Sequence, residues 1–258
     1  MTSLRRTLVI AGNDLALLRQ DPFVAIVLVA MPLVVMTFVK PAFAPALRSE
    51  GYPAANGAEQ AVPGMALMFV FFMVTFTALG FFREHVWGTW DRLRSMPVQG
   101  HEILTSKIVL PFAVIACQQV VLFTAGVVFF GLHVEGRIPA LVAVDLAFTV
   151  WLTAFCLATV AVCRTFQQVL AVSNLGAIVF AGIGGALTPI PTLPDWAQTV
   201  AHATPDYWAM RGFNSVLLEG RGLEGVLLPV GVLVASAAVL AIVAATRFRF
   251  DAPKGGML

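Results

Sequence analysis

The sequence predicts an all-α integral membrane protein with six membrane-spanning helices. Of its 258 residues, 59% are hydrophobic and 12% are charged, and the mean hydropathy is +0.88. An ordinary soluble domain has about 25% charged residues. Long apolar segments recur from end to end, and the basic residues gather on alternate flanks of them. Residues 1–258 are therefore expected to form a single transmembrane domain.

Six segments approach the roughly 20 mostly apolar residues that a spanning helix needs. Each is flanked by charged residues or by sequence rich in glycine and proline. The predicted spans are residues 23–39, 62–82, 108–131, 140–163, 169–187 and 226–246.

Two further segments are too polar to span a membrane. Residues 1–20 place leucines near one helical stripe among charged residues, which suits a helix lying in the membrane interface; an ordinary flank of the first span is the alternative. Residues 188–225 are polar and rich in proline, yet they contain two stretches of helical pattern. We expect them to form short or re-entrant helices on the outer side, before the sixth span.

The basic residues predict the orientation of the chain, because lysine and arginine are favoured on the cytoplasmic side of a membrane. With a cytoplasmic N-terminus, 11 of the 16 basic residues fall on cytoplasmic flanks and 5 on the other side. An odd number of spans would place Arg247, Arg249 and Lys254 outside. Both termini are therefore predicted to be cytoplasmic. The outer basic residues are Lys40, Arg48, Arg137, Arg211 and Arg221.

Several kinds of site have no signature in this sequence. The phosphate-binding pattern GxxxxGK[ST] is absent, so no ATP site is recognisable. No GxSxG or HExxH motif occurs, and no carboxylates pair within the spans. Cys117, Cys156 and Cys163 lie in apolar runs, where a thiol usually behaves as a small hydrophobe. We therefore predict no catalytic residue, no metal and no cofactor bound by this chain, and the net charge of +2 indicates no nucleic-acid partner.

The segment 83–107, between the second and third predicted spans, is unusually rich in charge. Thr89 follows Gly88 and can cap a short helix that Pro97 ends. Asp91, Arg92 and Arg94 would face the cytoplasm, with Trp90, Leu93 and Met96 on the other face. Such an amphipathic helix can bind another protein; a positive-inside loop without a partner is the alternative.

Two spaced motifs resemble the membrane-spanning subunits of type-2 ABC exporters. GTWDRLR is similar to the drug- and daunorubicin-resistance branch, and residues 184–213 resemble the proline-rich outer segment before that family's last span. His85, Val86 and Ser106 depart from the family pattern. The first motif comprises Glu84, Gly88, Thr89, Asp91, Arg92, Leu93, Pro97, Val98 and Lys107, and the second Gly185, Pro189, Pro194, Trp196, Pro205, Tyr207 and Trp208.

This resemblance implies a complex of two permease subunits, identical or paralogous, with two ATP-binding subunits that carry the ATP and magnesium. An amphipathic cargo such as a drug, antibiotic, lipid or glycolipid would move outward across a bacterial plasma membrane by alternating access. The residues implied to couple this movement to the ATPase are Glu84, Gly88, Thr89, Asp91, Arg92, Leu93, Arg94 and Pro97.

The resemblance also implies a translocation path along the second and fifth spans. The candidate lining residues are Phe72, Thr75, Phe76, Asn174 and Phe180, for which lipid contact is the alternative explanation. On the fifth span, Ala177, Ala181 and Gly185 recur every four residues, which permits close helix packing either within the chain or between subunits.

Two other classes of protein remain as alternatives. An ion-coupled secondary transporter would use acidic groups inside the membrane. Asp145 is the acidic residue in question, but it lies near the outer end of the fourth predicted span and is expected to be hydrated. An intramembrane enzyme would need a nucleophile and a base, or metal ligands, converging within the spans.

Overall fold

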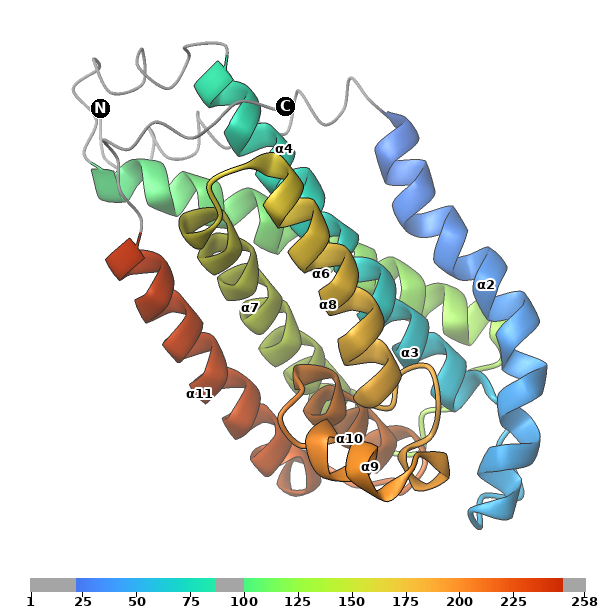
Figure 1. The fold of residues 1–258 in the computed structure, drawn as a ribbon. Helices are drawn as coiled ribbons and strands as arrows, with labels where there is room; N and C mark the ends of the chain where they lie inside the picture. The colour runs from blue at the N-terminus through green and yellow to red at the C-terminus, as the bar shows by residue number, and fades with distance from the viewer. Residues whose placement is uncertain (1–21, 87–99, 248–258) are drawn as a thin grey trace.

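A computed structural model describes residues 22–86 and 100–247, and all the regular structure in these ranges is helical (Figure 1). The interfacial helix predicted for residues 1–20 lies outside them. The elements are α2 (Pro22–Ser49), α3 (Ala58–Val70), α4 (Phe72–Val86), α6 (Gly100–Phe130), α7 (Ile138–Val162), α8 (Phe166–Ile183), the 3₁₀ turn η1 (Ile190–Thr192), α9 (Asp195–Ala201), α10 (Pro205–Leu217) and α11 (Leu223–Arg247).

The prediction of six spans is confirmed. Among the described residues, six helical segments are long and apolar enough to cross a membrane, and α3 with α4 forms the second of them. Because the number is even, the start of α2 and the end of α11 lie toward the same end of the bundle (Figure 1). The described helices are therefore those of a multi-pass membrane protein.

The first span is longer than the sequence predicted. It was expected to end at residue 39, but α2 continues to Ser49. The predicted span ended before Lys40 because a lysine inside a span is energetically costly. In the structure, Lys40 Nζ donates a hydrogen bond of 2.6 Å to the carbonyl oxygen of Phe130. The charged group therefore has a partner, and the helix continues beyond it.

The second and fourth spans form the centre of the bundle. In the second span 67% of the apolar window is buried, and in the fourth 56%, against 22–33% in the other four. Phe71, between α3 and α4, is fully buried and contacts the rings of Phe148, Trp151 and Phe155 on α7. The junction of the two halves of the second span is therefore anchored on the fourth.

The sixth span packs along the fourth, as α11 and α7 lie side by side in Figure 1. Small residues allow this close approach: Ala158 and Ala161 of α7 form a buried cluster with Ala244 of α11. Close packing through small side chains is typical of helices in membranes. This pair completes one side of the bundle.

The segment before the sixth span contains the short helices that the sequence predicted, η1, α9 and α10. They lie together at one end of the bundle, in orange (Figure 1). The α10 helix packs against α3, α7, α8 and α11 and buries most of one face. Gly212 makes this possible, because a side chain there would collide with Val144 of α7.

Candidate functional site

The predicted path residues come from two helices that contact each other, α4 of the second span and α8 of the fifth. Thr75 on α4 hydrogen-bonds Ser173 on α8, with 2.7 Å between the hydroxyl oxygens. Ser173 donates to the carbonyl of Val169 at 2.8 Å, which leaves Thr75 as the donor in this pair. A polar contact therefore joins two otherwise apolar spans at a point where the sequence singled out Thr75 but missed Ser173.

Phe180 belongs to a packed cluster of aromatic rings and does not face open space. Its ring centre lies 5.7 Å from that of Phe71, 6.1 Å from Trp151 and 6.2 Å from Phe155. Trp151 and Phe155 stack on each other at 5.2 Å. In this conformation the cluster fills the space between the second, fourth and fifth spans.

The other three path candidates are more open to the surroundings or half-buried. Phe72 is 36% exposed and its ring lies 5.8 Å from that of Phe69. Phe76 and Asn174 are half-buried, and Phe76 packs against the core. The structure thus brings the five candidates onto adjoining helices, and their contact with cargo stays a prediction.

The small-residue stripe of α8 packs inside this chain. Ala177 is 2% exposed and Ala181 is fully buried. Gly185 follows the helix with φ of 88°, and its carbonyl accepts a hydrogen bond of 2.6 Å from Gln60 of α3. The opposite face of α8 is exposed, with Leu175 at 63%. Of the two explanations for the stripe, the structure shows packing within the chain.

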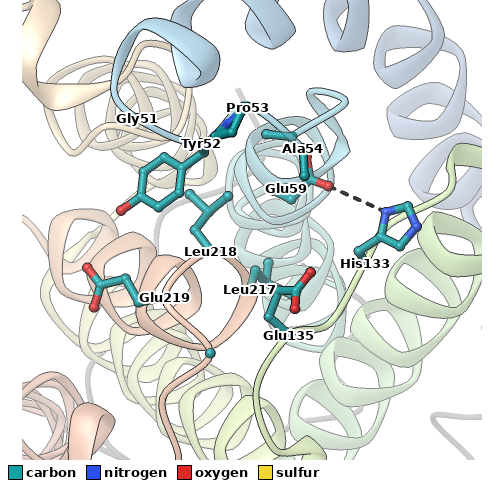
Figure 2. Close-up of a pocket in the computed structure, with 12 residues that line it drawn as sticks. Gly51, Tyr52, Pro53, Ala54, Glu59, His133, Glu135, Leu217, Leu218 and Glu219 are labelled. Atoms are coloured by element: carbon teal, nitrogen blue, oxygen red, sulfur yellow. Dashed lines mark ion pairs between the residues drawn. The ribbon is translucent and has the colours of Figure 1, made fainter.

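A hollow of about 410 Å³ lies where three connections meet (Figure 2). It is bordered by the loop after α2, the loop after α6 and the end of α10. Glu59, in the first turn of α3 beside the loop after α2, Glu135, in the loop after α6, and Glu219, just after α10, each contribute a carboxylate. Tyr52 adds an aromatic ring. Glu219 is paired with Arg221 at 2.8 Å. Sequence reasoning gave these residues no role, because only the fold brings the three connections together.

Glu59 is the buried member of this group, with 3% of its side chain exposed. Its Oε2 accepts hydrogen bonds from the backbone N–H groups of Asn56 at 3.2 Å and Gly57 at 3.1 Å. Its Oε1 lies 3.9 Å from Nδ1 of His133 (Figure 2). The carboxylate therefore fixes the loop that enters the second span.

Two aspartates carry buried oxygens for which the described residues supply no hydrogen-bond partner. Asp206 is fully buried in the first turn of α10, and burial raises its pKa to about 8. Asp145 was expected to be hydrated, but its Oδ1 is buried without a partner. Asp145 as a whole is half-buried, and α6 and α10 pack against the helix that carries it, α7; its hydration stays a prediction.

Most of the predicted ATPase-coupling residues lie outside the part of the chain that the structure describes. Gly88, Thr89, Asp91, Arg92, Leu93, Arg94 and Pro97 lie outside the described residues. Glu84 lies in the last turn of α4, of which the structure describes the backbone only. The helices on either side, α4 and α6, belong to the second and third spans.

Comparison with known proteins gave one family and one relative. The chain matches the model of a family described as "ABC-2 type transporter" over residues 6–218. It is 28% identical to the linearmycin resistance permease protein of Bacillus subtilis (strain 168) over 192 aligned residues. The aligned stretch covers 74% of this chain and 49% of the relative. The chain thus spans about half the length of that relative. No solved structure matches it.

Proposed function

Because the chain belongs to the ABC-2 type transporter family, we propose that it is the membrane-spanning subunit of an ATP-binding cassette exporter. The family match over residues 6–218 is the observation that carries this proposal. The six spans agree with it. A permease of this family works with an ATP-binding subunit, which supplies the hydrolysis.

The proposed assembly contains two permease subunits and two ATP-binding subunits, with ATP and magnesium on the latter. The segment from Glu84 to Pro97 transmits closure of the ATPases to the spans, and the cargo path opens alternately to the two sides. The support for this segment is its resemblance to coupling helices of the family. The contact of Thr75 with Ser173 supports joint movement of the second and fifth spans.

The proposed cargo is amphipathic, such as an antibiotic or another drug, a lipid or a glycolipid. The name of the Bacillus relative, which concerns resistance to linearmycin, supports an antibiotic. The partly exposed rings of Phe72 and Phe76, two of the proposed path residues, support a largely apolar cargo, because aromatic rings offer a large apolar surface. An ion-coupled carrier is the second candidate, favoured by the buried and unpartnered Oδ1 of Asp145.

The proposed location is a bacterial plasma membrane with both termini cytoplasmic. The support is that 11 of the 16 basic residues then lie on cytoplasmic flanks. This orientation puts α9, α10 and the hollow around Glu59 on the outer side. Membrane-impermeant thiol labelling of a Glu135→Cys variant on intact cells tests it, since labelling is expected only if the loop after α6 is outside.

The proposed function is tested by purifying the tagged chain from its native membrane in mild detergent and identifying what copurifies by mass spectrometry. We expect an ATP-binding subunit in equal amount to the permease. Purified in lipid, this complex should hydrolyse ATP, and the permease alone should not. Repeated recovery of the chain without an ATPase would favour the ion-coupled carrier instead.

A further inference from the structure

The inner half of the first span contains a backbone carbonyl that its own helix cannot satisfy. In an α-helix the carbonyl of Leu28 would accept from the N–H of residue 32. Residue 32 is proline, which has no N–H. The side-chain amide of Gln118 on α6 donates to this carbonyl instead, at 3.0 Å. Leu28 and Gln118 are each only 4% exposed, so water does not supply a ready substitute.

A second contact joins the same two helices toward the other end. The α6 helix ends at Phe130, where the last carbonyls have no partner within the helix. Lys40 of α2 donates to the carbonyl of Phe130 at 2.6 Å. A positive charge at this position also opposes the negative end of the helix dipole. Lys40 is half-buried within a helix of the first span.

The two contacts are in register. Leu28 and Lys40 on α2 are separated by the same number of residues as Gln118 and Phe130 on α6. This separation corresponds to about 18 Å along each helix. Each helix supplies one side-chain donor and one backbone acceptor. The two spans run in the same direction and are therefore joined at two matching levels by reciprocal hydrogen bonds.

The first span lies at the edge of the bundle, where α2 packs against α3 and α6. Only 22% of its apolar window is buried, and Met31, Val34 and Phe38 are more than half exposed. In an apolar solvent, packing and hydrogen bonds between helices take over from the hydrophobic effect. The hydrogen bonds of Gln118 and Lys40 therefore help to determine where this peripheral helix packs on the bundle.

We propose that Gln118 and Lys40 are positioning residues that dock the first span on the third as one unit. Pro32 makes the Gln118 contact obligatory, because it frees the carbonyl that Gln118 satisfies. This inference concerns the chain itself and holds whether or not the partner is an ATPase. It predicts an interaction between substitutions at Pro32 and Gln118, which a general loss of packing would not produce.

The test is a double-mutant cycle on thermal stability in detergent. Gln118→Leu should lower Tm by about 3 °C, since it leaves a buried carbonyl unpaired. Pro32→Ala restores an N–H four residues after Leu28, so Gln118→Leu should have a much smaller effect in that background. Equal effects of Gln118→Leu in both backgrounds would overturn the proposal.

Gln119→Leu is the matched control. Gln119 is fully buried on the same helix, and neither atom of its amide has a hydrogen-bond partner among the described residues. Its replacement should not lower Tm, and Pro32→Ala should not change the result. If both glutamines depend on Pro32 alike, the effect is not specific to the contact with Leu28.

Spin labels report the docking directly. Phe38 and Val128 are exposed and stand at matching levels on the two helices, so cysteines are placed there in a background without Cys117, Cys156 and Cys163. With Lys40 and Gln118 in place, the distribution of spin–spin distances should be narrow. It should broaden when Lys40→Met is combined with Gln118→Leu. It should be narrow again when Lys40→Arg takes the place of Lys40→Met in that combination. An unchanged distribution in the combined variant would overturn the proposal.

Discussion

At the scale of single residues, the unpartnered carboxyl of Asp206 has a consequence for stability. A buried carboxyl group without hydrogen bonds favours its neutral form. Burial raises the pKa of Asp206 from 3.8 to about 8 in the folded protein. The contribution of this group to stability is therefore fully present below about pH 4 and is lost as pH rises toward 8. The loss is at most about 1.4 kcal/mol for each pH unit in that window.

Asp206→Asn should remove this pH dependence, because asparagine keeps the shape and cannot ionise. We expect the variant to have a higher Tm than the parent at pH 8 and a similar Tm at pH 4, measured by thermal unfolding in detergent. Asp195→Asn is the control, since Asp195 is exposed in the first turn of the neighbouring helix α9. A lower Tm for Asp206→Asn at pH 8 would contradict the assignment of the destabilisation to the charged carboxylate.

The sequence, with the resemblance that it carries, identified some members of the candidate site and missed others. Thr75 and Phe180 were reached through the resemblance to exporters, and the structure brings their helices together. Ser173 was missed because a lone serine in a span carries no signal until its partner Thr75 is known. Trp151 and Phe155 share one helical face, and that spacing is the pattern by which sequence reasoning could have found them.

At the scale of elements, the second and fifth spans approach closely at one end because glycine occupies the contact. A side chain on Gly64 of α3 would collide with the backbone carbonyl of Ala186, just after α8. One turn earlier, Gln60 donates to the carbonyl of Gly185 at 2.6 Å. The two spans are thus joined through backbone groups, which cannot move aside without moving the chain.

Gly64→Ala should therefore destabilise the protein by about 1–3 kcal/mol, since overpacking at a rigid contact forces the backbone to shift. A drop in Tm in detergent measures this. Gly80→Ala in the same span is the control, because a side chain there meets nothing within 4 Å and alanine favours helix. Equal behaviour of the two variants would show that Gly64 does not set the approach of the spans.

Hydropathy predicted the number and order of the spans but not all of their limits. Length and apolar content are properties of each segment alone, so six spans could be counted from the sequence. The end of α2 could not, because the hydrogen-bond partner of Lys40 is Phe130, which lies 90 residues further along the chain. The α10 helix was recognised as helical, but its burial depends on Gly212 meeting α7.

At the scale of the whole molecule, the proposed exporter needs a connection between the ATPase and the cargo path. The second span ends in α4 on one side of the coupling segment, and the third span begins with α6 on the other. The same α4 carries Thr75, which contacts the fifth span, and α6 is joined to the first span through Gln118. Movement of this segment would therefore reach four spans, the second and third directly, the fifth through Thr75 and the first through Gln118.

The last prediction follows from this connection. Replacing both Asp91 and Arg92 with alanine should remove charged contacts to the ATPase without changing the helices that carry the path. In the purified complex reconstituted in liposomes, ATP hydrolysis should continue while export of the cargo falls by at least tenfold. Glu135→Ala combined with Arg137→Ala is the matched control, since it also removes one acidic and one basic residue, both exposed, from the loop after α6. Export that is unchanged by the first pair, or reduced equally by both, would mean that the segment from Glu84 to Pro97 does not couple hydrolysis to transport.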